Sequence, residues 1–124
     1  MAVQDFRELD VWREAMSLVT QVYQQTKGFP KEETYGLTNQ VRRAAVSVPS
    51  NIAEGQGRRT TREFLNHLSI ARGSLLEVQT QIEIGHRLNY MTSEAAQSID
   101  QQIGRVARLL NGLINALARK LDTP

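Results

Sequence analysis

The sequence predicts an all-α protein, an up-down-up-down antiparallel four-helix bundle whose second helix is kinked at Pro49. Apolar residues recur three and four positions apart in four successive segments, which is the spacing of one helix face. No segment sustains the alternation of apolar and polar residues that is typical of a half-buried strand. The connections are short, so successive helices are expected to lie antiparallel.

The chain is expected to form one four-helix-bundle domain over residues 1–124. A chain of 124 residues can bury a single core but not two. The apolar spacing, together with the residues that start and stop helices, predicts helices over about residues 5–27, 31–56, 61–88 and 93–121.

The first two helices are predicted by two apolar stripes and by the residues between them. The first stripe consists of Phe6, Leu9, Trp12, Met16, Val19 and Tyr23. Gly28 and Pro30 end this helix. Pro30 followed by Glu32 and Glu33 suits the first turn of the next helix. Proline is tolerated there, and acidic side chains are stabilised by the positive end of the helix dipole. The second stripe consists of Leu37, Val41, Ala44 or Ala45, Val48 and Ile52.

The third and fourth helices show the same spacing more regularly. Thr60 and Glu63 have the spacing of a capping box at the start of the third helix, and Asn89 closes it. Thr92 or Ser93 caps the fourth helix. The two stripes consist of Phe64, Leu68, Ala71, Leu75, Val78 and Ile82, and of Ile99, Ile103, Val106, Leu110, Leu113 and Leu117.

A second apolar row accompanies these two stripes. It consists of Leu65, Leu76, Leu109, Ile114 and Leu121. The row either widens the core face, since an isolated bundle needs roughly three apolar positions per heptad, or forms a lateral surface for self-association.

Composition narrows the classes of function. The chain has no cysteine, which excludes disulfides, thiolate nucleophiles and cysteine metal sites, and suits a reducing cytoplasm. The opening MAVQDFRELD has no apolar signal-peptide region, and no apolar run approaches the roughly 18 residues of a membrane span. We expect a cytoplasmic protein with no membrane contact.

No catalytic residue, metal site or cofactor is predicted. Glu83 and His86 have the Glu-x-x-His spacing of a di-iron site, but the second copy of that motif is missing. The other histidine, His67, lies about 28 Å away along a helix that rises 1.5 Å per residue. Gly55-Gln56-Gly57 falls short of a Walker loop, and no Gly-x-Ser-x-Gly motif is present. We therefore expect a protein that is not an enzyme.

The stretch SVPSNIAEGQGRRTTREF, residues 47–64, interrupts the helical pattern. Pro49 lacks an amide hydrogen and its ring crowds the carbonyl of residue 45, so the second helix is expected to kink or restart there.

Four residues that follow Pro49 are interpreted as a structural motif. Asn51 is a poor residue in a helix interior, so its amide is expected to have a specific partner. Asn51 and Glu54 are expected to hold the bend at Pro49. Gly55 and Gly57 are interpreted as helix stops, because glycine takes the left-handed conformation without strain.

Positive charge is concentrated in the same part of the chain. The net charge is +2, yet residues 40–63 hold five arginines against two glutamates, whereas residues 1–33 hold four basic and six acidic side chains. Arginines beside a helix N-terminus are typical of phosphate recognition. The candidate nucleic-acid-binding residues are Arg42, Arg43, Arg58, Arg59 and Arg62. A second, lower-ranked group of candidates consists of Arg105, Arg108, Arg119 and Lys120. Because no aromatic residue interleaves the arginines, base stacking is not predicted.

Residues 41–82, VRRAAVSVPSNIAEGQGRRTTREFLNHLSIARGSLLEVQTQI, resemble the core signature of the four-helix-bundle family also called 23S rRNA intervening-sequence proteins. The matching segments are Arg43-Ala44, Val48 to Gly55, Gly57-Arg58, Glu63-Phe64 and Ala71 to Glu77. Phe6, Leu9 and Trp12 also resemble the opening of the family. So does the turn Leu88-Asn89-Tyr90, where a glycine is usual in place of Asn89.

The resemblance implies a left-handed up-down bundle that assembles as a homopentamer with a central pore. Some members are encoded within insertions in bacterial 23S rRNA genes. A related protein, the accessory variability determinant of diversity-generating retroelements, binds a reverse transcriptase and nucleic acid through basic surfaces. This chain is less basic than such proteins. The family motif also implies an alternative for Arg43, an internal pair with Glu54.

Two hypotheses of function follow. The first is a non-catalytic oligomeric bundle that binds structured RNA or DNA through arginine patches, which symmetry would multiply. The alternative is a protein-protein interaction scaffold or accessory subunit with no nucleic-acid role, whose partner surface would be apolar patches outside the core.

Overall fold

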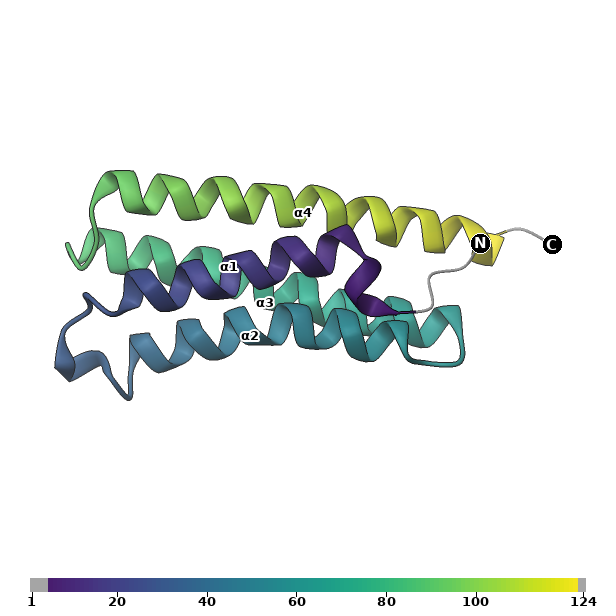
Figure 1. Ribbon diagram of the computed structural model, residues 1–124, viewed down its shortest axis with the longest axis horizontal. Coiled ribbons are helices and arrows are strands. Elements are labelled where there is room, and N and C mark those ends of the chain that lie inside the picture. Colours follow the sequence, from purple (N-terminus) through teal and green to yellow (C-terminus); the bar gives the residue numbers. More distant parts are fainter. Residues whose placement is uncertain (1–4, 123–124) are drawn as a thin grey trace.

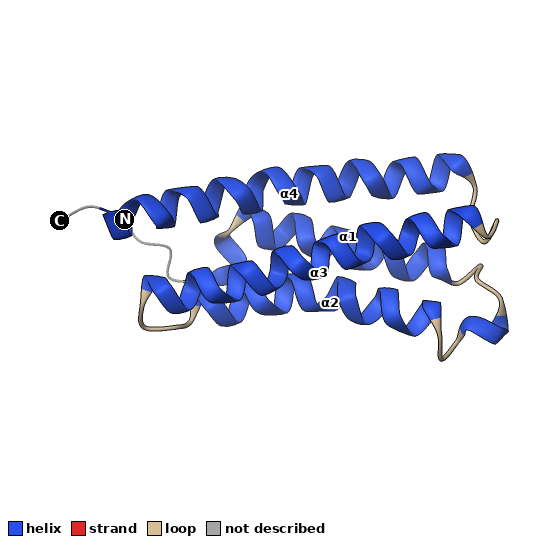
Figure 2. Ribbon diagram, turned by 180° about the vertical axis from the view of Figure 1, so that it is seen from behind, coloured by secondary structure: helices blue, strands red, loops and turns tan. Residues whose placement is uncertain are grey.

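The computed structural model describes residues 5–122 and contains four long helices packed side by side (Figures 1 and 2). They run in alternating directions, and no strand occurs within the described residues, so the predicted all-α up-down bundle is confirmed. The first four and last two residues of the predicted domain lie outside this range. The helices are α1 (Asp10–Thr26), α2 (Leu37–Gln56), α3 (Thr61–Arg87) and α4 (Ser93–Asp122), and two short 3-10 turns are η1 (Phe6–Glu8) and η2 (Lys31–Glu33).

The core lies between the four helices and contains the stripes predicted for α2, α3 and α4. Val41, Val48 and Ile52 of α2 are fully buried, and α4 buries the predicted stripe except for the partly exposed Leu113. The most extensive packing is between α2 and α3. Both helices bury several small residues, and alanine, serine and glycine let two helix backbones approach closely. The buried small residues include Ala44, Ala45, Gly55, Ala71 and Ser74.

The stripe predicted for α1 is wrong in part: Leu9, Trp12 and Val19 pack against the edge of the core, but they are not its centre. The helix buries Val11, Ala15, Leu18 and Val22, whereas Met16 and Tyr23 of the predicted stripe are 38% and 40% exposed. Two apolar rows run along α1, and the row of smaller side chains faces the core. The larger residues lie on the flank of the helix beside α2, where Trp12, Met16 and Val19 line a groove.

The first two helices also begin later than predicted. Leu9 is extended, with ψ of 125°, and separates η1 from α1. Residues 31–33 form only a 3-10 turn, and α2 starts at Leu37. The Glu33 carboxylate caps α2 by accepting a hydrogen bond of 3.0 Å from the Leu37 amide, and its second oxygen accepts one of 2.9 Å from the Tyr90 hydroxyl. Glu33 therefore holds the α1–α2 connection against the turn between α3 and α4.

The turn between α3 and α4 closes on Asn89, which has a positive φ of 63°. The Tyr90 amide donates to the Gly85 carbonyl at 2.9 Å and the Asn89 amide to the His86 carbonyl at 3.0 Å, which is the Schellman pattern. Asparagine tolerates this left-handed conformation better than most residues. Thr92 then caps α4, because its hydroxyl accepts the Ala95 amide at 3.1 Å.

None of the helices within residues 5–122 is both long and apolar enough to cross a membrane.

The hydrogen bonds to Glu33 predict an acid-dependent loss of stability. The Leu37 amide and then the Tyr90 hydroxyl lower the pKa of Glu33 below its ordinary 4.5. A carboxyl group whose pKa is lowered by folding stabilises the protein fully at a pH above its pKa in the unfolded chain. This stability is lost as the pH falls through its pKa in the folded protein. Glu33→Gln should therefore lower the melting temperature at pH 7, with a gap that narrows towards pH 3. Thermal melts across that range test it, with Glu32→Gln as the control; an unchanged gap would contradict it.

Candidate functional site: the α2–α3 elbow

The candidate site is the elbow, residues 47–64, in which α2 ends and α3 begins. It lies at the same end of the bundle as the start of α1 and the end of α4 (Figure 1). The helix α2 continues through the buried Pro49 to Gln56, and α3 starts at Thr61. The predicted restart at Pro49 therefore does not occur, and the kink stays a prediction.

Asn51 is the centre of a polar chain that joins the two helices. Its Nδ2 donates to the carbonyl oxygen of Ser47 at 2.9 Å and to the Ser47 hydroxyl at 3.0 Å. The hydroxyls of Ser47 and Ser74 share a hydrogen bond of 2.8 Å, which crosses from α2 to α3. Asn51 Oδ1 lies 3.2 Å from His67 Nδ1 on α3. Asn51 therefore has the specific hydrogen-bond partners that are expected for an asparagine in a helix interior.

This polar chain of hydrogen bonds continues from His67 to Arg58 in the elbow. Arg58 Nε donates to His67 Nε2 at 3.2 Å, so this ring nitrogen acts as the acceptor. With Nε2 as the acceptor, the ring proton lies on Nδ1, where it donates to Asn51 Oδ1. Glu54 is exposed and lies 3.8 Å from Arg58 Nη2 and 3.9 Å from His67 Nδ1. The polar chain fixes Arg58, whereas Glu54 contributes only a long, solvent-exposed ion pair with Arg58.

The interpretation of Gly55 and Gly57 as left-handed helix stops is wrong. No glycine within residues 5–122 has a positive φ, and Gly57 lies at φ −80°. Gly55 is instead a packing residue inside α2. A Cβ atom on Gly55 would lie 2.7 Å from Cβ of His67 and 2.9 Å from Cδ1 of Phe64, closer than real side chains allow. A Cβ atom on Gly57 would meet only ordinary contacts, of 3.6 and 3.7 Å.

The start of α3 is fixed by its predicted cap. The Thr60 hydroxyl accepts the Glu63 amide at 3.1 Å, and the same hydroxyl donates to Glu63 Oε1 at 3.0 Å. The Glu63 carboxylate thus bonds to the hydroxyl of Thr60, whereas in a capping box it would bond to the Thr60 amide. Glu63 is consequently held at the cap, where it forms no ion pair with the neighbouring arginines.

The five candidate arginines do not form one cluster. Arg42 is used inside the fold: its Nε donates to the Thr26 hydroxyl at 2.8 Å, and its guanidinium lies 4.6 Å from the centroid of the Tyr23 ring. Arg43 lies on another face, beside Ser47, Ser74 and Glu77. No pair between Arg43 and Glu54 is present in the described part of the chain; Glu54 lies near Arg58 instead.

Arg58, Arg59 and Arg62 are the three arginines that the fold gathers around the start of α3. All three are exposed. Arg58 is held by His67, whereas Arg59 and Arg62 have no hydrogen bond or ion pair to any described residue. Unpaired guanidinium groups beside the free amides of a helix N-terminus form an electropositive surface that favours a bound anion.

A pocket of about 300 Å³, here called the elbow pocket, is lined by two of these arginines, Arg58 and Arg59. Its apolar residues are Leu9, Phe64, Leu113 and Leu117, and its polar residues are Gln56, Arg58, Arg59, Thr60, Thr61 and Lys120. No sequence pattern predicts this combination, because the lining residues come from the start of α1, the elbow and the end of α4. The aromatic ring of Phe64, which belongs to the predicted core stripe, thus lies among the cationic side chains.

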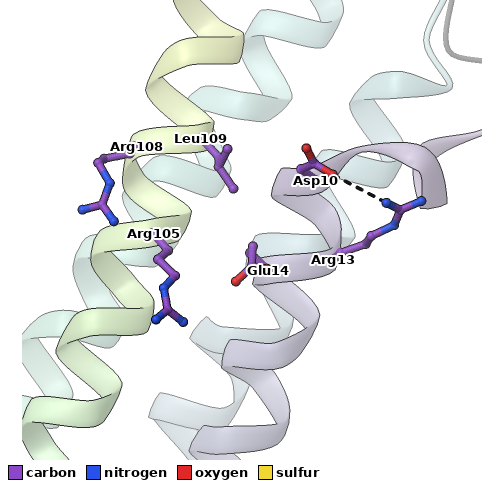
Figure 3. A pocket seen from close by; sticks show the side chains of 6 residues that line it. All are labelled: Asp10, Arg13, Glu14, Arg105, Arg108 and Leu109. Carbon is purple, nitrogen blue, oxygen red and sulfur yellow. Dashed lines mark ion pairs between the residues drawn. The ribbon is translucent and has the colours of Figure 1, made fainter.

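The second group of basic candidates has mixed surroundings. Arg105 and Arg108 line a pocket of about 470 Å³ between α1 and α4, opposite Asp10 and Glu14 (Figure 3). Arg105 Nη1 donates to Gln102 Oε1 at 3.0 Å. The two carboxylates make this pocket a poorer phosphate site than the elbow. The last candidates lie at the end of α4, where Lys120 lines the elbow pocket and Arg119 is exposed.

The described residues form no group of three or more histidine, aspartate or glutamate side chains that could hold a metal ion. Glu83 and His86, which have the spacing of half a di-iron site, have other partners. Glu83 Oε2 accepts a hydrogen bond of 2.8 Å from Arg87, which lowers the pKa of the Glu83 carboxyl. His86 Nε2 lies 3.1 Å from the Ser93 hydroxyl.

The fold and the elbow define a class of protein, an all-α four-helix bundle with a cationic surface at one end. The chain belongs to the 23S rRNA-intervening sequence protein family, which it matches over residues 7–112. The chain is also similar to a solved protein of unknown function from the S23 ribosomal protein family of Bacteroides thetaiotaomicron. The two are 22% identical with a TM-score of 0.75, over 84% of this chain and 97% of the other. No curated protein matches the chain.

The polar chain predicts different outcomes for two neighbouring substitutions. Asn51→Ala removes the partner of His67 Nδ1 and one of the two partners of the Ser47 hydroxyl at the α2–α3 contact, so it should lower the free energy of unfolding by about 1–3 kcal/mol. Glu54→Ala, its control, removes only exposed ion pairs and should change stability by less than about 0.5 kcal/mol. Chemical denaturation measures both, and equal losses would contradict the assignment of Asn51 as the centre of the chain.

Proposed function

We propose that the protein is a non-catalytic, homo-oligomeric bundle that binds structured RNA or DNA through phosphate contacts at the elbow. The observation that carries the proposal is the pair Arg59 and Arg62. Both are exposed at the start of α3 and neither is neutralised by a described residue. Arg58 and Lys120 extend the same positive surface.

The charge of the surroundings supports this choice. Only two acidic residues, Glu54 and Glu63, lie in the elbow, and the Thr60 hydroxyl holds the second of them. The other basic candidates are engaged within the fold, as Arg42 is, or line a pocket that also contains carboxylates, as Arg105 and Arg108 do. The elbow is thus the surface on which a phosphate meets least competition. The name of the family, which refers to 23S rRNA, agrees with a nucleic-acid ligand.

Self-association is the second part of the proposal. A groove of about 350 Å³ between α1 and α2 is lined almost entirely by apolar side chains, those of Trp12, Met16, Val19, Val46, Pro49 and Ala53 with Ser50. Burying such a surface against another copy would be favourable by roughly 25 cal/mol per Å² of apolar area. The resemblance to the family supports a homopentamer, and the lack of cysteine suits a reducing cytoplasm. A ring would repeat the elbow arginines around its axis, so that weak phosphate contacts add.

The alternative, a protein-protein interaction scaffold or accessory subunit with no nucleic-acid role, is favoured by one other observation. Leu76 and Ile84 of α3 are 58% and 42% exposed and line a pocket with Asp100 of α4. Exposed apolar side chains that recur along one helix face suit a protein partner.

Nucleic-acid binding at the elbow predicts a steep dependence on salt. Fluorescence anisotropy with an RNA hairpin and a DNA duplex, over about 50 to 200 mM salt, should show affinity that falls as salt rises, because binding releases counterions. The double variant Arg59→Ala/Arg62→Ala should weaken binding and flatten the slope by about 0.9 for each lost duplex phosphate contact.

Arg72→Ala is the matched control, since Arg72 is also exposed on α3 but lies outside the elbow. It should have little effect on the salt slope. Sedimentation velocity should show that all variants assemble as the wild type does. An absence of binding at the lowest salt, or an equal loss in Arg72→Ala, would overturn phosphate binding at the elbow.

A further inference from the structure

We infer that the elbow pocket receives one unpaired nucleobase, so that the preferred ligand is a single-stranded or looped segment of nucleic acid and not a continuous duplex. This inference rests on the proposed function and specifies its ligand. Its basis is the presence of Phe64 and three leucines within a rim of cationic side chains.

The apolar side chains that line the elbow pocket, here called its apolar floor, are not explained by phosphate binding alone. Phe64 is the fourth residue of α3, Leu113 and Leu117 come from α4, and Leu9 from the start of α1. Phosphate groups gain nothing from aromatic and aliphatic surface. A planar base gains from both, because every base has a face that can stack on an aromatic ring or lie against apolar side chains.

The size of the pocket limits what can enter it. Its volume of about 300 Å³ is at the lower end of the range for small-molecule pockets. Such a space suits a single ring system and not a helical segment. A base in a duplex is stacked and paired, so it must be extruded before it can enter. An unpaired base in a loop or single strand needs no such opening.

The rim is arranged for a nucleotide. Arg58, Arg59 and Lys120 place positive charge beside the apolar floor, so that a phosphate can be neutralised while its base lies on Phe64. Thr61 lines the same pocket, and its hydroxyl is a group that can hydrogen-bond to the edge of a base. This group discriminates weakly among bases, and we expect little sequence preference.

The floor is also held in place before any ligand binds. Phe64 packs so closely against Gly55 that a Cβ atom there would lie 2.9 Å from its Cδ1. The Thr60 cap fixes the first turn of α3, and His67 holds Arg58. A pre-formed site avoids part of the entropy loss on binding, which favours a specific pose for the base.

The test uses RNA hairpins that carry the fluorescent base 2-aminopurine either in the loop or in the stem. Titration of the wild-type protein should change the fluorescence of the loop probe, because stacking on Phe64 alters its environment, and should leave the stem probe nearly unchanged. The result requires no substitution, so it does not depend on the stability of any variant. Binding that leaves the loop probe unchanged would overturn the inference.

Two variants separate this inference from the proposed function. Phe64→Leu keeps an apolar side chain at Gly55 but removes the ring, and should weaken binding of a single-stranded oligonucleotide about tenfold with an unchanged salt slope. Arg59→Ala/Arg62→Ala should reduce the salt slope for hairpin and duplex alike. If Phe64→Leu binds like the wild type while the arginine variant fails, the base pocket is refuted and phosphate binding stands. If the wild-type protein binds neither RNA nor DNA, both proposals fail and a protein partner is favoured.

Discussion

The close contact between the end of α2 and the start of α3 is the constraint on which the candidate site depends. Gly55 has no side chain, and this lets the last turn of α2 lie directly against His67 and Phe64. Any larger residue would push the two helices apart. The positions of Arg58 before α3 and of Arg62 in its first turn follow from this contact, because only a short loop joins the helices there.

A chain of hydrogen bonds supports the same contact on its polar side. Ser74, Ser47, Asn51 and His67 pass from one helix to the other and end at Arg58. Buried polar groups are tolerated only when their partners are present, so this chain favours one register of α2 on α3 over others. It also joins stability to the proposed function, since the group that ends the chain is one of the cations of the elbow.

The sequence was sufficient for the bundle and for the cores of α2 to α4, because in each of these helices one apolar stripe is longer than any second row. It failed for α1, which carries two stripes, and the larger side chains such as Met16 turned out to lie outside the core. The role of Gly55 was missed because glycine near a helix end also fits a left-handed stop. The elbow pocket could not be predicted, since Leu9, Phe64 and Lys120 meet only through the packing of separate elements.

The most direct test of this account is the free energy of unfolding of Gly55→Ala compared with that of Gly57→Ala. Both changes add one methyl group, two residues apart in the elbow. The account predicts that Gly55→Ala costs about 1–3 kcal/mol, because its Cβ must displace α3, whereas Gly57→Ala stays within about 0.5 kcal/mol of the wild type. Equal effects, or a stable Gly55→Ala protein, would contradict the claim that close packing at Gly55 positions the site.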